Sequence, residues 1–393
     1  MPSAFAVPLR QSLTLAALLT AAVLPMARAQ AEDVKLPQTM TFTAYDTGTS
    51  GFNITVAVGK ALKEKYGTDV RVLPAGNDVA RLAPVKAKRA QVSAMGMGIY
   101  FAQEAVLEFA VKEWGPQPLQ VLLSSIDCNG GNLGIAADTG AKELKDLKGK
   151  RVGFVVGSPA LNQNALAMLA FAGLTKDDVK IVEFASYGAM WKGLVNNDVD
   201  AAFGSTITGP AKEAETSPRG LVWPSLPFDD KAGWERVKKI SPFFFQHTVT
   251  CGAAGLSPKT PKQMGNFPYP VYMVYAGTPE AEAYAVTKAM IASYDAYKDG
   301  APGASGLDVK LQTTQWSVPF HPGAAKALKE AGKWSDADEA HNQGLIKRQK
   351  LLADAWEAFL KTSPPADKDA FRTAWMGARK AALEKAGMPV VFE

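Results

Sequence analysis

Three turns rich in glycine, serine and threonine carry the residues best suited to bind a small molecule. They are Thr47-Gly48-Thr49-Ser50-Gly51, Ala75-Gly76-Asn77-Asp78 and Val156-Gly157-Ser158-Pro159. Each turn follows a short apolar run and precedes a segment with helical periodicity, which is where a strand passes into a helix. The N-terminus of such a helix adds about half a positive charge to the turn's N–H groups and hydroxyls. The turns therefore either bind a carboxylate or another anion, or only cap their helices.

Other side chains near these turns have two possible roles. Arg81 lies just beyond the second turn and either clamps a carboxylate bidentately or pairs with Asp78 three residues earlier. Four aromatic residues flank the turns and either cover a ligand or pack in a core: Tyr45, Phe52, Tyr187 and Trp191.

Signatures of enzymes and metal sites are missing from the sequence. It contains no phosphate-binding G-x-x-x-x-G-K-[ST], no G-x-S-x-G and no H-E-x-x-H motif. The three histidines lie in dissimilar contexts, and His321 is better placed to organise the turn before a helix than to transfer a proton. Cys128 and Cys251 form no C-x-x-C motif and have no nearby histidine, which argues against zinc. We expect no catalysis, metal or cofactor, and the two cysteines are either bridged or buried as free thiols.

The N-terminus has the features of a secretory signal peptide. An uncharged apolar run from Leu13 to Leu24 follows Arg10 and is shorter than the roughly 20 residues that span a bilayer. Ala27-Arg28-Ala29 supplies an Ala-x-Ala cleavage signal. We expect cleavage after Ala29 and a soluble periplasmic protein, with an N-terminal membrane anchor as the alternative. Removal of this segment lowers the formal net charge from +5 to +3, which does not indicate a nucleic-acid partner.

Strand and helix patterns alternate along the chain, restart after residue 127, and predict an α/β protein of two lobes built on parallel sheets. Ligands bind such sheets at the carboxyl ends of their strands. One helix is expected over residues 100–114, and two more at the end of the chain, over 336–361 and 366–386, packed across the lobes. The expected organisation is a signal peptide (1–29), a first lobe (38–137 with 268–334), a second lobe (138–262) and C-terminal helices (335–393).

Five segments in this order resemble the TAXI family, the solute-binding components of TRAP transporters. They are the Thr47–Gly51 turn, Gly76-Asn77-Asp78-Val79, Asp146-Leu147-Lys148-Gly149-Lys150-Arg151-Val152-Gly153, Asp200-Ala201-Ala202-Phe203 and Pro319-Phe320-His321-Pro322-Gly323-Ala324. The resemblance implies a periplasmic-binding-protein-like fold of type II, in which hinge crossovers join two lobes around a ligand cleft. It also implies a membrane permease as partner, with import driven by an ion gradient. Phe52-Asn53 departs from the family pattern, so the identity of the ligand does not carry over.

The resemblance also implies a set of contacts to a small carboxylate or amino-acid-like solute. Together with Tyr45 and Arg81, they come from the first lobe (Thr47, Gly48, Thr49, Ser50, Gly76, Asn77 and Asp78) and the second (Gly157, Ser158, Pro159, Asn162, Ser205 and Thr206). Two other functions remain open, a sensory subunit that presents its ligand to a membrane receptor and a periplasmic enzyme on a related scaffold.

Overall fold

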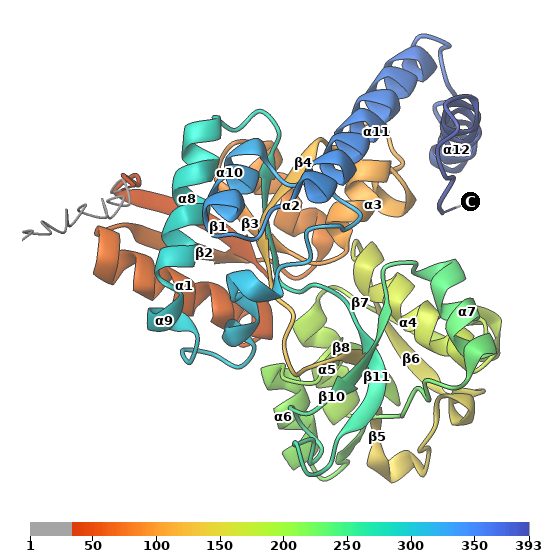
Figure 1. Cartoon of the computed structure of the whole chain (residues 1–393). Coiled ribbons are helices and arrows are strands. Elements are labelled where there is room, and N and C mark those ends of the chain that lie inside the picture. Colours follow the sequence, from red (N-terminus) through yellow and green to blue (C-terminus); the bar gives the residue numbers. More distant parts are fainter. Residues whose placement is uncertain (1–33, 393) are drawn as a thin grey trace, which may run out of the picture. The chain divides into compact units, whose positions relative to one another are not determined.

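The computed structural model describes residues 34–392, which fold into two α/β lobes, each built around its own sheet (Figure 1). The predicted signal peptide and its cleavage after Ala29 lie outside the described residues. The fold class is the predicted one. The chain passes between the lobes twice, once between strands β4 and β5 and once between β11 and β12.

Lobe 1 contains a five-stranded sheet in the order β2-β1-β3-β12-β4. Its strands are β1 (Thr39–Ala44), β2 (Asp69–Pro74), β3 (Val92–Met95), β4 (Leu119–Ser124) and β12 (Val271–Tyr275). Its helices are α1 (Ser50–Tyr66), α2 (Asp78–Lys86), α3 (Gly98–Glu104), α8 (Glu280–Ala292), α9 (Tyr294–Tyr297) and α10 (Pro322–Glu330). His321 is the N-cap of α10 and accepts a hydrogen bond from Gly323 N, which confirms its expected role in that turn.

Lobe 2 contains a seven-stranded sheet in the order β10-β11-β5-β8-β6-β7, with β9 paired to β5. Its strands are β5 (Gly131–Ala136), β6 (Arg151–Val155), β7 (Lys180–Phe184), β8 (Ala201–Ser205), β9 (Leu221–Val222), β10 (Phe245–Val249) and β11 (Lys262–Asn266). Its helices are α4 (Pro159–Phe171), α5 (Tyr187–Val195), α6 (Gly209–Thr216) and α7 (Lys231–Ile240).

Each sheet is only partly parallel, in contrast to the prediction. In lobe 1, β1 runs parallel to β2 and β3, but β12 runs antiparallel to β3 and β4. In lobe 2, β6 runs parallel to β7 and β8, but β5 is antiparallel to β8. Of the reversed strands, β12 and β5 enter a sheet from the other lobe, so no helix of their own lobe turns them into the parallel direction, and β10 is reversed as the antiparallel partner of β11.

The first crossover comes earlier in the chain than the expected boundary at residue 137. All of β5 pairs within the lobe 2 sheet, so the chain leaves lobe 1 between Ser124 and Gly131. The return crossover lies between Asn266 and Val271, close to the expected boundary. The stretch Gly131–Ala136 is apolar and buried throughout, and such a run fits either sheet until its partner strands are known.

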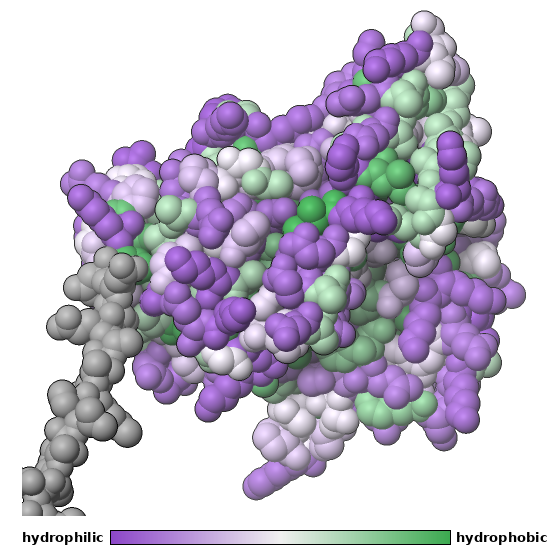
Figure 2. All heavy atoms as spheres, turned by 45° about the horizontal axis from the view of Figure 1, so that its top comes forward, coloured by the Kyte–Doolittle hydropathy of each residue, from purple (hydrophilic) through white to green (hydrophobic). Residues whose placement is uncertain are grey.

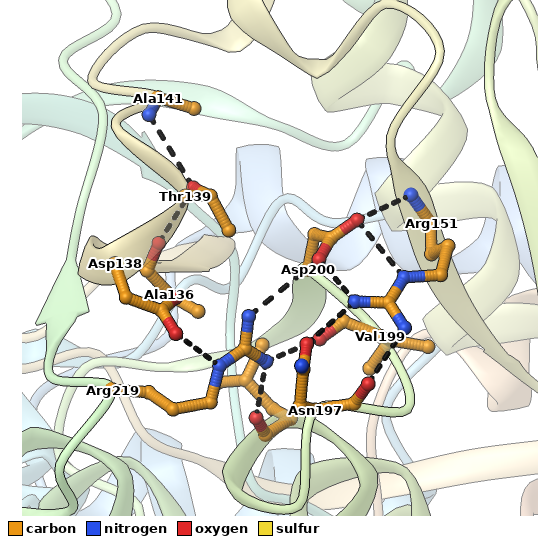
Figure 3. Close-up of polar contacts among 10 residues, drawn as sticks. Ala136, Asp138, Thr139, Ala141, Arg151, Asn197, Val199, Asp200 and Arg219 are labelled. Atoms are coloured by element: carbon orange, nitrogen blue, oxygen red, sulfur yellow. Dashed lines mark hydrogen bonds and ion pairs between the residues drawn. The ribbon is translucent and has the colours of Figure 1, made fainter.

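An ionic cluster lies at the start of strands β6 and β8 in lobe 2, around the buried side chains of Asp200 and Arg219 (Figure 3). Asp200, which precedes β8, accepts hydrogen bonds from the backbone N–H and the guanidinium of Arg151. Arg219 lies 3.6 Å from the same carboxylate, pairs with Asp138 at 2.9 Å, and donates to two backbone carbonyls. These charges are paired within one lobe and therefore fix β6, β8 and their connecting turns rather than a ligand.

On the face shown in Figure 2, hydrophilic residues predominate and hydrophobic residues appear between them in separate patches. Among residues 34–392, no helix combines the length and the apolar character needed to cross a bilayer.

The C-terminal helices α11 (Asp336–Leu360) and α12 (Lys368–Lys385) pack against each other and against lobe 1. Their main anchor is Glu104, which is fully buried at the end of α3. Its carboxylate accepts hydrogen bonds from Arg348 at 2.7 and 2.8 Å and is also paired with Arg379. Trp375 donates its indole N–H to Ala105 O at 2.7 Å. The described contacts of both helices thus run to lobe 1, whereas the sequence led us to expect a brace across both lobes.

Helix α3 is shorter than the expected helix over 100–114. It ends at Glu104, and Ala105 adopts a left-handed conformation with φ 51°. The ion pairs at Glu104 and the Trp375 bond at Ala105 hold the chain in this turn. Contacts with helices more than 240 residues later in the chain therefore override the local helical pattern.

The two cysteines are joined by a disulfide. Cys128 lies in the first crossover and Cys251 follows β10, and their Cα atoms are 5.5 Å apart. Because the bridge closes a loop over a sequence separation of 123 residues, we expect the double substitution Cys128→Ser with Cys251→Ser to lower the free energy of unfolding by about 2–4 kcal/mol. Chemical denaturation measures this loss. Titration of the denatured, unreduced protein should find no free thiol, and two free thiols per chain would contradict the bridge.

Candidate functional site

A cavity lies between the two lobes, at the ends of their central strands. The space open to the centre of a water-sized sphere is ≈ 50 Å³. Since one water needs about 10–15 Å³ by this measure, the cavity has room for a small solute or a few waters. Its lining comes from lobe 1 (Tyr45, Thr49, Ser50, Gly96 and Met97), from the chain around the crossovers (Asn129, Gly130, Asn266, Phe267 and Tyr269), and from lobe 2 (Gly131, Ala160, Leu161, Asn164, Tyr187, Phe203, Gly204, Ser205 and Thr208).

Tyr45 is the centre of a buried polar network on the lobe 1 side. It follows β1 and donates its hydroxyl proton to Asp78 Oδ1 at 2.7 Å, with Ser158 Oγ 3.1 Å away in lobe 2. The guanidinium of Arg81 lies 3.4 Å from the centre of the Tyr45 ring and 2.6 Å from Asp78 Oδ1. Burial, and then the Asp78 carboxylate, raises the pKa of Tyr45, so its hydroxyl stays protonated at neutral pH. Of the two roles expected for Arg81, the structure shows the ion pair with Asp78. The side chain is fully buried.

Two carboxylates of lobe 1 occupy the N-termini of two lobe 2 helices. Asp78 Oδ2 accepts a hydrogen bond from Ala160 N, in the first turn of α4, at 2.9 Å. Asp46 Oδ2 accepts one from Gly188 N, in the first turn of α5, also at 2.9 Å. A carboxylate at a helix N-terminus is stabilised by the unpaired N–H groups and by the helix dipole. These two contacts, which we name the carboxylate latches, join lobe 1 to lobe 2.

The latch formed by Asp46 gives a direct test of this arrangement. Asp46→Ala removes the acceptor for Gly188 N and should destabilise the closed lobes by about 1 kcal/mol, which weakens solute binding roughly fivefold. Asp46→Asn keeps an acceptor oxygen without the charge. Its affinity for the solute should lie between those of Asp46→Ala and the unaltered protein. Isothermal titration calorimetry with the bound solute measures both. Equal affinity in all three proteins would show that this latch does not contribute to closure.

The predicted site residues fall into three groups. Four of them line the cavity: Tyr45, Thr49, Ser50 and Ser205. Others bring the lobes into direct contact. Gly76 O accepts from Tyr187 N at 3.0 Å, Gly157 O from Val79 N at 3.1 Å, and Gly48 O from Gly209 N at 3.2 Å. The turns predicted to hold a ligand thus partly hold each other.

The remaining predicted residues are engaged inside one lobe. Asn77 caps α2 and Pro159 begins α4. Asn162 hydrogen-bonds both backbone groups of Val155 at 2.9 and 3.0 Å, and Thr206 bonds to Cys251 O at 2.9 Å. Thr47 is exposed. None of these five residues is among those that line the cavity.

Several lining residues were not predicted as ligand contacts. Asn129 lies in the first crossover and Asn266 at the end of β11, within segments that have weak periodicity. Asn164 lies in the second turn of α4 and is 2% exposed. Tyr269 comes from the return crossover, and its hydroxyl lies over Gly51, where a Cβ would be 2.4 Å from it. For Asn164, the sequence offers one signal of a cavity position, a polar residue within an otherwise apolar helix.

The cavity wall has no ionised side chain of its own. Among the described residues that line it, none is Asp, Glu, His, Lys, Arg or Cys. Within residues 34–392, no group of three or more acidic, histidine or cysteine side chains is arranged to hold a metal ion. Burial raises the pKa of Tyr269 to about 12 and that of Tyr187 further, so both phenols are neutral hydrogen-bonding groups at pH 7.

Comparison with solved structures finds similar chains that bind small molecules. One is the alkanesulfonate-binding protein SsuA of Xanthomonas axonopodis pv. citri bound to MOPS, with 16% identity over 82% of this chain and 93% of that one and a TM-score of 0.44. Another is the substrate-binding protein AbpA of an amino acid ABC transporter of Streptococcus pneumoniae bound to L-arginine, with 14% identity, 79% and 96% coverage, and a TM-score of 0.38. A third is an ancestral arginine-binding protein bound to arginine, with 16% identity, 67% and 96% coverage, and a TM-score of 0.40.

The sequence comparison identifies the family. The match covers residues 42–332, which include both sheets apart from the first three residues of β1, both crossovers and every residue of the cavity wall. This protein therefore belongs to the NMT1-like family.

Proposed function

We propose that this protein is the extracytoplasmic solute-binding subunit of a TRAP-type transporter of the TAXI kind. It captures a small carboxylate or amino-acid-like solute between its lobes and delivers it to a membrane permease. The observation that carries this proposal is the cavity, whose wall is built from both lobes and both crossovers. A site of this construction is complete only when the lobes are closed, so solute occupancy and lobe position are coupled.

The chemistry of the cavity supports binding rather than catalysis. Its wall offers phenol, hydroxyl and amide groups beside aromatic and aliphatic surface, which is the usual composition of a site that orients a small ligand. Acyl transfer, hydrolysis or proton abstraction requires a nucleophile or a base of suitable pKa within reach of the substrate. The nearest carboxylates, Asp46 and Asp78, are committed to helix N-termini. We therefore propose a protein that releases its solute unchanged.

The delivery mechanism follows from the energetics of closure. A solute shifts the lobes only by its differential affinity for the closed state, and a change from nearly all open to nearly all closed requires a preference of roughly 10⁴. The carboxylate latches lower this requirement because they stabilise the closed lobes on their own. The permease then recognises the closed form, and the export signal predicted at the N-terminus places the protein in the periplasm with it.

Mass spectrometry of small molecules that co-purify with the mature protein tests the proposal. A solute recovered in stoichiometric amount should raise the unfolding temperature, since a ligand at 100 times its dissociation constant stabilises by about 2.7 kcal/mol. It should also be recovered unchanged after long incubation. Conversion of the solute would favour the enzyme alternative. A purified permease that imports the solute only with this protein present would separate a transport role from a sensory one.

A further inference from the structure

The cavity restricts the charge of the solute that it accepts, given the proposed solute-binding function. A carboxylate needs hydrogen-bond donors or a positive potential, and an ammonium group needs an anion, because an unpaired charge is costly to bury. Neither a cationic nor an anionic side chain is among the described residues of the cavity wall. Charge complementarity must therefore come from the backbone, and above all from helix N-termini.

Two of the helix N-termini near the cavity are already occupied. The carboxylate latches place Asp78 on the N-terminus of α4 and Asp46 on that of α5. A second carboxylate from a solute would have to displace one of them. Displacing Asp78 would also leave Arg81, which is fully buried, without its partner. In the closed lobes, these two positions are therefore closed to the solute.

Two further helices of eight or more residues begin at the cavity: α1, and α6, whose N-cap Thr208 lines it. The first N–H of α6, that of Gly209, already donates to Gly48 O at 3.2 Å, so α1 is the better candidate for the solute. Helix α1 has 17 residues, and its N-cap Thr49 and first residue Ser50 both line the cavity. The neutral hydroxyl of Tyr269 lies beside the same turn, over Gly51. Thr49 Oγ1 already accepts the N–H of Phe52, so it is the dipole of α1 together with the hydroxyls of this turn that favours a single anionic group at this end of the cavity.

The opposite wall requires a hydrogen-bond donor from the solute. Asn164, on α4, lines the cavity and is 2% exposed, and its Oδ1 has no hydrogen-bond partner among residues 34–392. A buried amide oxygen without a donor is destabilising, and a hydroxyl or amide group of the solute would satisfy it. An ammonium group could also donate here, but no carboxylate in the wall would balance its charge.

We propose that the solute is a small monocarboxylate that carries an uncharged donor, a hydroxyl or an amide, and neither an ammonium group nor a second carboxylate. Its carboxylate lies at the N-terminus of α1, and its donor faces Asn164. Tyr45 and Tyr187, whose stacked rings have centroids 5.7 Å apart, form a wall beside the carbon chain. Within the broader class of carboxylates and amino-acid-like solutes, this arrangement selects hydroxy acids and acid amides.

Calorimetric titration of the solute-free mature protein with two matched pairs of probes tests this inference. The first pair is 2-hydroxypropanoate and alanine, which exchange a hydroxyl for an ammonium group. The second is butanedioate monoamide and butanedioate, which exchange an amide for a carboxylate. We expect the uncharged-donor member of at least one pair to bind about tenfold or more tightly than its partner. Equal or tighter binding of alanine or butanedioate overturns the inference.

A charge change at Asn164 makes the test independent of the choice of carbon chain. Asn164→Asp supplies the missing anion, so we expect it to weaken hydroxy-acid binding and strengthen amino-acid binding, a relative change of about tenfold or more. Asn196→Asp, an exposed change outside the cavity, is the matched control and should leave the order of the probes unaltered. An unchanged order in Asn164→Asp overturns the inference. If no probe and no cell extract raises the unfolding temperature of the unaltered protein, it is the proposed function itself that fails.

Discussion

Replacing Gly76 and Gly209 together by alanine should hold the lobes apart and weaken solute binding tenfold or more. A Cβ on Gly76 would lie 2.5 Å from Ser186 Cβ, and one on Gly209 would lie 2.6 Å from Gly48 O. Both overlaps run across the two lobes and meet groups that have little freedom to move. Each 1.4 kcal/mol lost from the closed state costs about a factor of ten in affinity. Calorimetric titration of the solute measures the loss.

The lobes of this double variant should remain intact. Neither glycine has a positive φ, so neither position requires the left-handed backbone that alanine disfavours. The unfolding temperature without solute should therefore change little. Gly344→Ala with Gly377→Ala is the matched control, because a Cβ at either position meets nothing within 4 Å. An unaltered affinity in the Gly76 and Gly209 variant would mean that the solute binds without this closure.

Replacing Glu104 by alanine should cause the largest loss of stability of any single substitution considered, about 3–5 kcal/mol. The side chain is 0% exposed and is the shared partner of Arg348 and Arg379, which are 7% and 0% exposed. Its removal leaves two buried guanidinium groups without an anion, at the junction of α3 with α11 and α12. Denaturant unfolding measures the loss. Glu357→Ala, at an exposed position of α11, is the control and should change stability by less than about 0.5 kcal/mol.

A second comparison separates the missing charge from the missing side chain. Glu104→Gln keeps the volume and one acceptor oxygen, so it should be less destabilising than Glu104→Ala. Its free energy of unfolding should still be well below that of the unaltered protein. A loss in Glu104→Ala no larger than that of the exposed control would show that α11 and α12 are not anchored through this carboxylate.

The contribution of Glu104 should also depend on pH. Burial acts to raise the pKa of its carboxyl, but hydrogen bonds and charges from Arg348 and Arg379 outweigh burial and hold the pKa below its ordinary value. Because the folded pKa is lower than the unfolded one, this stability is fully present at neutral pH and is lost as the pH falls through the folded value. The difference in unfolding free energy between Glu104→Gln and the unaltered protein should shrink in the same acidic range. A difference that is constant down to the folded pKa would contradict this assignment.

The sequence predicted most of the fold because its signals are local. The turns that contain Thr49 and Asn77 were expected to precede helices, and both side chains cap the helices that follow, α1 and α2. The lobe to which β5 belongs and the end of α3 at Glu104 depend instead on partners far along the chain. Periodicity carries no information about such contacts.

The candidate site was predicted less well, for a related reason. Gly-rich turns do lie at the interface of the lobes, but a turn with free N–H groups suits a protein carboxylate as well as a solute carboxylate. Only the structure shows that Asp46 and Asp78 take these positions on α5 and α4. Asn164 and Tyr269 reach the cavity from a helix interior and a crossover, so neither belongs to a turn motif.

The most direct test of the account is the distance between the lobes in solution, measured by pulsed electron resonance between two spin labels. Lys60→Cys on α1 and Lys192→Cys on α5 place the labels at exposed positions of lobe 1 and lobe 2, and the native cysteines are bridged to each other. On adding the co-purified solute to the solute-free protein, we predict a shift from a broad distance distribution to a single, shorter distance. This shift should be smaller in the double variant Gly76→Ala with Gly209→Ala. One unchanged distance distribution with and without the solute would contradict closure of the lobes around it.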